Sequence, residues 1–229
     1  MVPVYSHHWD VGVLSGPHGA PEFFTPGDIE MFFSTDWKVH HNSDRTGIRL
    51  IGPKPQWARK DGGEAGLHPS NIHDNAYSVG AVDFTGDMPV VLGPDGPSLG
   101  GFVCPATIIR SELWKMGQLR PGDTVRFHPV SIRPALQMEA AQNHSIESLT
   151  GELADLIEER QVESPVLTST PLSPMGPAVV RRQSGDRAIL IEYGPNVLDL
   201  SLRFRVHALQ RELERTALSG VLDITPGVR

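Results

Sequence analysis

The side chains best suited to chemistry are concentrated in one stretch, RKDGGEAGLHPSNIHDNAYS, which runs from Arg59 to Ser78. It combines cationic, carboxylate, imidazole, amide and phenol groups with several glycines and a proline. Such a loop can place donors, acceptors and a base around a small polar ligand, because loops on rigid scaffolds often carry function. The alternative is a long surface loop whose Asn and Asp side chains cap their own turns, and composition alone favours that alternative.

Four acidic and imidazole side chains of this stretch, Glu64, His68, His73 and Asp74, also raise the question of a metal site. Imidazole and carboxylate groups together suit several divalent ions. Their spacing, however, matches neither an i, i+4 pair on a helix nor a zinc signature. We therefore expect no metal at this stretch.

Two neighbouring segments offer further candidate groups. The glycines of residues 92–102 match neither GxxxxGK followed by Ser or Thr nor GxGxxG, so a nucleotide site is a weak interpretation. Tight turns at the mouth of a barrel explain them better, and the backbone N–H groups of Ser98 and Gly100 are then free to bind an anion or a polar ligand. Arg45 can hold a carboxylate or bicarbonate in a bidentate manner, or pair with a surface acid.

The elements that must position these groups are mostly strands. The 229 residues include 23 glycines and 20 prolines, which argues against a bundle of long helices. Short apolar runs bounded by Gly, Pro or Asp predict strands at Gly47–Gly52, Tyr77–Phe84, Met88–Gly93 and Asp123–Val130. Helix-start signals predict helices at Thr25–Thr35 and after Ser111 as far as Gly117.

The composition changes after about residue 132, and we divide the chain into residues 1–132, 133–177 and 178–229. In the second part, an amphipathic pattern predicts a helix at Glu147–Gln161, and the prolines of Ser164–Pro177 are typical of a linker. In the third part, we expect a strand at Arg187–Gly194, a helix at Leu198–Thr216 with a solvated face carrying Arg203, and a strand at Gly220–Gly227. So short a piece buries little core alone, which indicates the beginning of a second domain.

Charge and hydropathy exclude several classes of function. The net charge of −7 provides no basic surface for nucleic acid or anionic membrane. There is no apolar run long enough for a transmembrane helix, and the first residues lack the features of a secretory signal. The single cysteine, Cys104, excludes an intramolecular disulfide and is expected to be a buried small side chain. We expect a cytoplasmic protein with no nucleic-acid or membrane partner.

Longer segments resemble a known family, the carboxyltransferase region of urea carboxylase, which is the biotin-dependent half of urea amidolyase. The resemblance rests on GPHGAPEFFTP, on NSDRTGIRLIGPKPQWARKDGGEAGLHPSNIHDNAYSVGAVDFTGD, on DGPSLGGFVCPAT, on QLRPGDTVRF and on ILIEYGPNVLDLSLRFRVHALQREL. It implies a mainly β fold: part of a cyclophilin-like β-barrel similar to allophanate hydrolase subunit 2, then part of a second cyclophilin-like domain similar to subunit 1.

The resemblance also implies a reaction. Members of this family carboxylate urea to allophanate, using ATP and bicarbonate on a biotin carboxylase domain and carboxybiotin on a carrier domain. This sequence contains neither an ATP-grasp domain nor an Ala-Met-Lys-Met biotin site. The resemblance therefore implies a fragment of a larger enzyme or a truncated reading frame, with the missing domains as partners and little activity on its own.

Roles for individual residues follow from this implied chemistry. Asp74 is expected to bind urea or act as the base, and His68 or His73 to relay a proton. The expected hydrogen-bonding and carboxylate-stabilising groups are Asn71, Asn75, Tyr77, Lys60 and Arg45. Relatives that act in 5-oxoproline hydrolysis or inhibit a sporulation kinase, and a non-functional remnant, are the alternatives. The segment HPSNIHDNAYS favours the urea branch.

Overall fold

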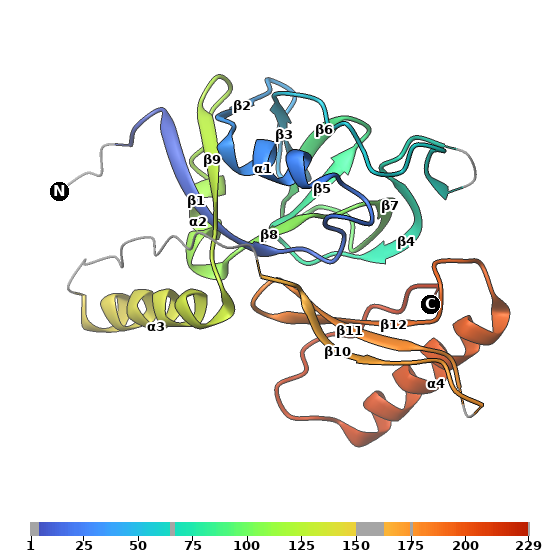
Figure 1. Ribbon diagram of the computed structural model, residues 1–229. Coiled ribbons are helices and arrows are strands. Elements are labelled where there is room, and N and C mark those ends of the chain that lie inside the picture. Colours follow the sequence, from blue (N-terminus) through green and yellow to red (C-terminus); the bar gives the residue numbers. More distant parts are fainter. Residues whose placement is uncertain (1–4, 65–66, 150–162, 175, 229) are drawn as a thin grey trace.

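A computed structural model describes residues 5–64, 67–149, 163–174 and 176–228 (Figure 1). The strands are β1 (His8–Ser15), β2 (Trp37–Val39), β3 (Gly47–Ile51), β4 (Asn71–Ala76), β5 (Ala81–Thr85), β6 (Met88–Leu92), β7 (Leu99–Phe102), β8 (Ala106–Ile108), β9 (Thr124–Pro129), β10 (Val166–Thr170), β11 (Val179–Ser184) and β12 (Ala188–Tyr193). The helices are α1 (Pro26–Ser34), a 3-10 turn (Arg110–Glu112), α2 (Leu113–Met116), α3 (Ile132–Ser148) and α4 (Leu200–Thr216).

Seven strands form a closed barrel in the order β1-β8-β5-β6-β3-β2-β9. The barrel closes where β1 and β9 pair in parallel from His8↔Thr124 to Val13↔Pro129, while its other pairs are antiparallel. Closure leaves no unpaired barrel edge to attract other chains. Figure 1 shows α1 against the barrel, and the C-terminal strands and α4 together on the other side of β4.

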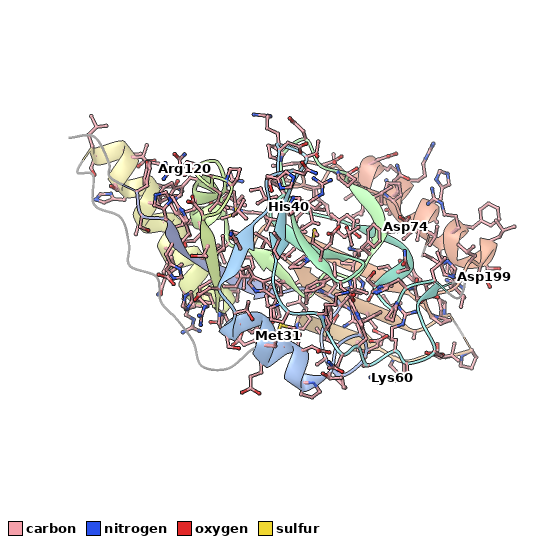
Figure 2. All side chains as sticks on the ribbon, turned by 90° about the horizontal axis from the view of Figure 1, so that it is seen from above. Met31, His40, Lys60, Asp74, Arg120 and Asp199 are labelled. Atoms are coloured by element: carbon pink, nitrogen blue, oxygen red, sulfur yellow. The ribbon has the colours of Figure 1, made fainter. Side chains whose placement is uncertain are left out.

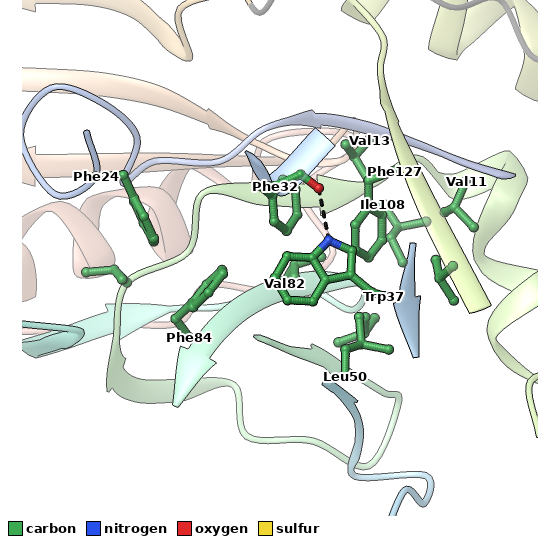
Figure 3. Close-up of a cluster of buried hydrophobic side chains, with 14 of the residues drawn as sticks. Val11, Val13, Phe24, Phe32, Trp37, Leu50, Val82, Phe84, Ile108 and Phe127 are labelled. Atoms are coloured by element: carbon green, nitrogen blue, oxygen red, sulfur yellow. Dashed lines mark hydrogen bonds between the residues drawn. The ribbon is translucent and has the colours of Figure 1, made fainter. Parts of the chain in front are cut away.

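Aromatic side chains fill the barrel (Figure 3). Trp37 is fully buried and donates from its indole Nε1 to the Phe32 carbonyl at 2.9 Å, and Phe32 stacks on Phe127 with ring centroids 5.0 Å apart. Phe32 belongs to α1, whose start is fixed by a reciprocal capping box between Thr25 and Asp28. A buried indole with its N–H satisfied combines large apolar burial with a fixed orientation.

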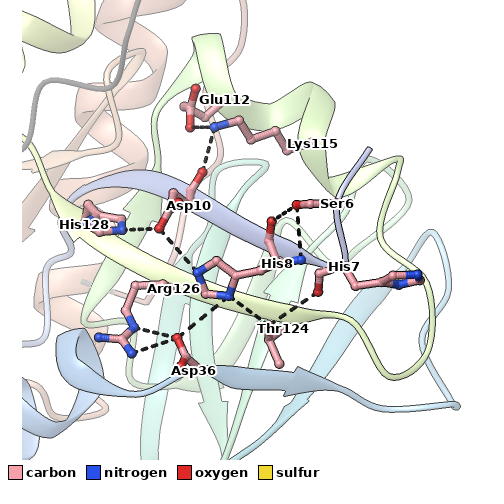
Figure 4. Close-up of polar contacts among 10 residues, drawn as sticks. All are labelled: Ser6, His7, His8, Asp10, Asp36, Glu112, Lys115, Thr124, Arg126 and His128. Atoms are coloured by element: carbon pink, nitrogen blue, oxygen red, sulfur yellow. Dashed lines mark hydrogen bonds and ion pairs between the residues drawn. The ribbon is translucent and has the colours of Figure 1, made fainter. Parts of the chain in front are cut away.

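A polar network covers the outside of the parallel closure (Figure 4). The Asp10 carboxylate on β1 lies 2.7 Å from His128 Nε2 on β9, and the Asp10 carbonyl accepts a hydrogen bond from Lys115 Nζ at 2.6 Å. Arg126 on β9 pairs with Asp36 at 2.8 Å. The Asp10–His128 contact ties the first barrel strand to the last from the solvent side, and the other two contacts join these strands to α2 and to the segment before β2.

The C-terminal unit is the three-stranded sheet β10-β11-β12 with α4. It meets the rest of the chain through Ser78, whose Oγ donates to the Ser184 carbonyl at 3.3 Å, and through Asp186, which accepts from the Arg110 backbone N–H at 2.7 Å. Glu139 on α3 adds ion pairs with Arg110, at 3.1 Å, and with Arg187. The two units therefore share a polar junction.

The sequence-based elements are confirmed for three of the four predicted strands of residues 1–132, for both helices there, and for β12 and α4. The mainly β class is confirmed too, and the barrel closes fully where only part of one was expected. The strand expected at Tyr77–Phe84 begins only at Ala81, and Gly220–Gly227 forms no strand. The domain boundaries stay a prediction.

The segment between the two units departs most from expectation. The linker expected at Ser164–Pro177 contains β10, because its β-branched residues pair with β11 despite the flanking prolines. The structure has a helix, α3, where none was expected, and Leu149 ends it in the left-handed conformation. The helix expected at Glu147–Gln161 falls mostly on residues 150–162, outside the described residues.

Candidate functional site

The polar stretch from Arg59 to Ser78 includes a strand, although it was read as a loop. β4 pairs with β7 in a two-stranded ribbon, from Asn71↔Phe102 to Ala76↔Leu99, with an irregular register between them. The Val103 N–H donates to the Ser70 carbonyl and extends the pairing of the ribbon, and the N–H of Phe84, on β5, donates to the Val103 carbonyl and attaches the ribbon to the barrel. The candidate side chains are therefore positioned by backbone pairing.

Asp74 lies on β4 beside the C-terminal unit (Figure 2). Burial raises the pKa of its carboxyl, opposed by hydrogen bonds from the backbone N–H groups of Asn75 and Val228 and by the charge of Arg203. A methyl group on Gly227 would come within 3.3 Å of Asp74 Oδ2. A carboxyl that binds protons more readily than usual, beside a junction, is a candidate base.

Glu64 connects three other groups of the site. Its carboxylate pairs with Arg59 Nη2 at 2.7 Å and with His73 Nε2 at 3.5 Å, and Asn196 Nδ2 lies 3.5 Å from it. Arg59 is held further by the Asn71 carbonyl, at 3.0 Å from Nη1. The predicted residue His73 therefore has a carboxylate partner in Glu64, and Asn71 contributes its backbone carbonyl.

Tyr77 makes structural hydrogen bonds. Its hydroxyl donates to the Phe102 carbonyl at 2.6 Å and accepts from the Phe102 N–H at 2.8 Å. Burial raises the pKa of this phenol further above its ordinary value. Its ring lies over Gly100, where a Cβ would come within 2.7 Å of Cε2. Gly100 therefore provides the space for this ring. The two hydrogen bonds of Tyr77, which follows β4, hold it to Phe102 at the end of β7.

His68 is separated from Asp74 by its contacts. Its Nε2 lies 3.2 Å from Asp87 Oδ1 and its Nδ1 lies 3.0 Å from Ser70 Oγ. Its ring packs edge-on against Trp57, with centroids 5.4 Å apart. The structure thus places His68 against the barrel with both ring nitrogens engaged.

Three more predicted residues lie at the surface. Arg45 is exposed and pairs with Asp95, with Nε 2.5 Å from Oδ2. Lys60 is exposed and donates from Nζ to the Gln56 carbonyl at 2.9 Å. Ser98 is exposed too, and its carbonyl accepts from the Tyr77 N–H at 2.9 Å. None of these contacts joins the three residues to Asp74.

Three residues of β4 and the C-terminal unit carry buried polar atoms that lack a hydrogen-bond partner. In the described parts of the chain, buried side-chain atoms without a hydrogen-bond partner include Asn75 Nδ2, Asn196 Oδ1 and Arg203 Nη1. Such atoms are rare in folded proteins, because each one costs about 1–3 kcal/mol when left unpaired. The sequence analysis placed Arg203 on a solvated helix face and gave Asn196 no site role, although both lie in a segment that resembles the family.

The described residues offer no group of three or more His, Cys, Asp or Glu side chains placed to hold a metal ion. Cys104 is buried, and burial raises the pKa of its thiol to about 12, with a contribution from Asp83. A thiol so difficult to ionise is a poor nucleophile. Over the same residues, no helix is long and apolar enough to cross a membrane.

The fold and site together define a β-barrel domain with a polar ribbon, which presents a carboxyl and unpaired donors and acceptors at its junction with a second unit. A family profile described as carboxyltransferase domain, subdomain A and B, matches residues 1–129. The match covers more than half of the chain, so the chain belongs to this family.

Individual relatives are similar over nearly the whole chain. It is 51% identical over 226 residues to the urea amidolyase of Lachancea kluyveri, covering 96% of this chain and 12% of that protein. It is 46% identical over 236 residues to the urea amidolyase of Saccharomyces cerevisiae, covering 100% of this chain and 13% of that protein. The crystal structure of the Kluyveromyces lactis urea carboxylase matches with a TM-score of 0.92 and 49% identity, over 100% of this chain and 21% of that one. The chain thus spans a small part of each relative's length.

Proposed function

We propose that this chain forms part of the carboxyltransferase of a biotin-dependent urea carboxylase, a cytoplasmic enzyme that transfers a carboxyl group to urea and yields allophanate. The observation that carries the proposal is Asp74, a carboxyl with a raised pKa on β4 beside unpaired polar atoms. The names of the relatives, urea amidolyase and urea carboxylase, support the choice of urea.

Urea is neutral and a weak nucleophile, so the site must orient it and accept a proton as the new C–N bond forms. Ionised Asp74 accepts hydrogen bonds from the urea N–H groups and takes one of their protons. Its raised pKa makes it a stronger base than an exposed Asp, which favours this transfer. We assign the onward transfer of that proton to His73, whose Nε2 lies 3.5 Å from the Glu64 carboxylate.

The donors of the site fit a ligand that carries carbonyl oxygens. Asn75 is 4% exposed and its Nδ2 has no partner, so it can donate to the urea carbonyl. A biotin on a carrier domain would supply the activated carboxyl group, after a biotin carboxylase domain had attached that group to it with ATP and bicarbonate. Those two domains and the remaining carboxyltransferase domains are the proposed partners.

The test is Asp74→Asn in the full-length protein. We expect urea-dependent ADP release to fall about 100-fold or more, which is the usual contribution of a positioned base. The matched control is Asp95→Asn, which removes a carboxylate from an exposed ion pair and leaves turnover unchanged. Retained turnover in Asp74→Asn would contradict the role of Asp74. ADP release that depends on 5-oxoproline or guanidine instead of urea would reassign the substrate.

A further inference from the structure

Arg203 is a charged group of the junction that takes no part in the proposed reaction. Arg203 lies in the first turns of α4, and its Nη1 is buried without a hydrogen-bond partner. No ion pair within 4.0 Å is formed between Arg203 and Asp74, although its charge lowers the pKa of that carboxyl. A buried guanidinium donor without an acceptor is costly, and its natural ligands are carboxylates and phosphates.

The surroundings of Arg203 indicate the polarity of the missing ligand. On one side, Asp74 accepts from the Asn75 and Val228 N–H groups and still has capacity to accept from a ligand. On the other side, Arg203 offers a donor that needs an acceptor. A molecule that fits both carries an N–H at one end and a carboxylate at the other.

We infer that Arg203 binds the carboxylate of the N-carboxylated urea formed at this site, while Asp74 faces its amide end. This inference rests on the proposed function and deepens it. Urea itself has no carboxylate, so Arg203 contributes little to urea binding. It contributes once the C–N bond has formed, when the transferred carboxylate must be held. The site is then composite: its base comes from β4 and its carboxylate-binding residue from α4.

The experiment measures two ligands on the full-length protein by calorimetry. One is urea, and the other is malonamate, in which a CH₂ group replaces the bridging NH of allophanate while the amide and the carboxylate remain. In Arg203→Gln we expect malonamate to bind about tenfold or more weakly, as for a lost charge-assisted hydrogen bond, and urea to bind as before. Arg203→Lys should recover part of the malonamate affinity, because the charge remains.

The matched control is Arg211→Gln, which removes an exposed arginine from the same helix and should change neither affinity. The inference is overturned if Arg203→Gln leaves malonamate binding unchanged, or if it weakens both ligands equally, as general damage would. The proposed function is tested separately by urea turnover in Asp74→Asn. If malonamate binding depends on Arg203 while the wild-type protein shows no urea turnover, the carboxylate site remains and the proposed function fails.

Discussion

Asp83 is a buried acid whose ionisation opposes folding, and it makes stability depend on pH. It lies on β5, 3% exposed, and its side chain has a long hydrogen bond of 3.5 Å from Thr85. Burial raises its pKa from 3.8 to about 7. In the unfolded chain the carboxyl ionises near pH 3.8, whereas in the folded barrel it stays protonated until about pH 7. Stability is therefore greatest below the lower value and is lost as pH rises towards the upper one.

The size of this loss follows from the difference between the two pKa values. Each unit corresponds to about 1.4 kcal/mol, so a shift from 3.8 to about 7 removes about 4 kcal/mol of unfolding free energy by pH 8. Asp83→Asn abolishes this term and costs about 2 kcal/mol for an incompletely bonded buried amide. The variant should gain about 2 kcal/mol at pH 8, or about 4–8 °C in Tm.

The assay is thermal unfolding of both proteins between pH 4.5 and pH 8, followed by circular dichroism. At pH 4.5 the wild-type carboxyl is protonated in the fold and its penalty is about 1 kcal/mol, so Asp83→Asn should then be the less stable protein. The sign of the difference should therefore change within this range. Parallel curves for the two proteins would refute the assignment of a neutral, buried Asp83.

Two further predictions concern the ribbon and the junction. Tyr77→Phe removes both hydrogen bonds to the Phe102 backbone and should lower the unfolding free energy by about 1–3 kcal/mol. The loss is measured by denaturation with guanidinium chloride in place of urea. Urea binding should not become weaker. Glu139→Gln removes the carboxylate that pairs with Arg110 and Arg187 and should cost about 1 kcal/mol. Limited proteolysis of the C-terminal unit should then be faster; unchanged cleavage would contradict a role in docking.

The sequence was sufficient where local signals agree with the global fold. TPGD predicts the start of α1 because the Thr25 cap and the Asp28 carboxylate bond each other's backbone, a contact made within four residues. Apolar runs bounded by turn residues predict β3 and β6 for the same reason, since alternation and turn chemistry agree.

The sequence was insufficient to predict the elements and contacts that depend on segments far apart in the chain. NIHDNA carries polar groups at four of its six positions, yet it forms β4, because backbone pairing with LGGF of β7 supplies the ladder. Arg45 was expected either to bind a carboxylate at the site or to pair with a surface acid, and it pairs with Asp95, fifty positions away, at the surface. Arg203 was expected on a solvated face, but the C-terminal unit turns that residue towards β4. The hydrophobic periodicity of a segment does not predict contacts between residues that are far apart in the sequence.

The properties of Asp74 depend on both units of the chain. Its position is set by β4, one of its two backbone donors is Val228, and the cation that lowers its pKa is Arg203 on α4. Undocking the C-terminal unit exposes the carboxyl to water, which removes the burial that raises the pKa, and also withdraws Val228 and Arg203, which lower it. Burial is the largest of these effects, so the pKa of Asp74 falls towards its ordinary value and the carboxyl becomes a weaker base. The junction formed by Ser78, Asp186 and Glu139 therefore controls the basicity of the site from outside it.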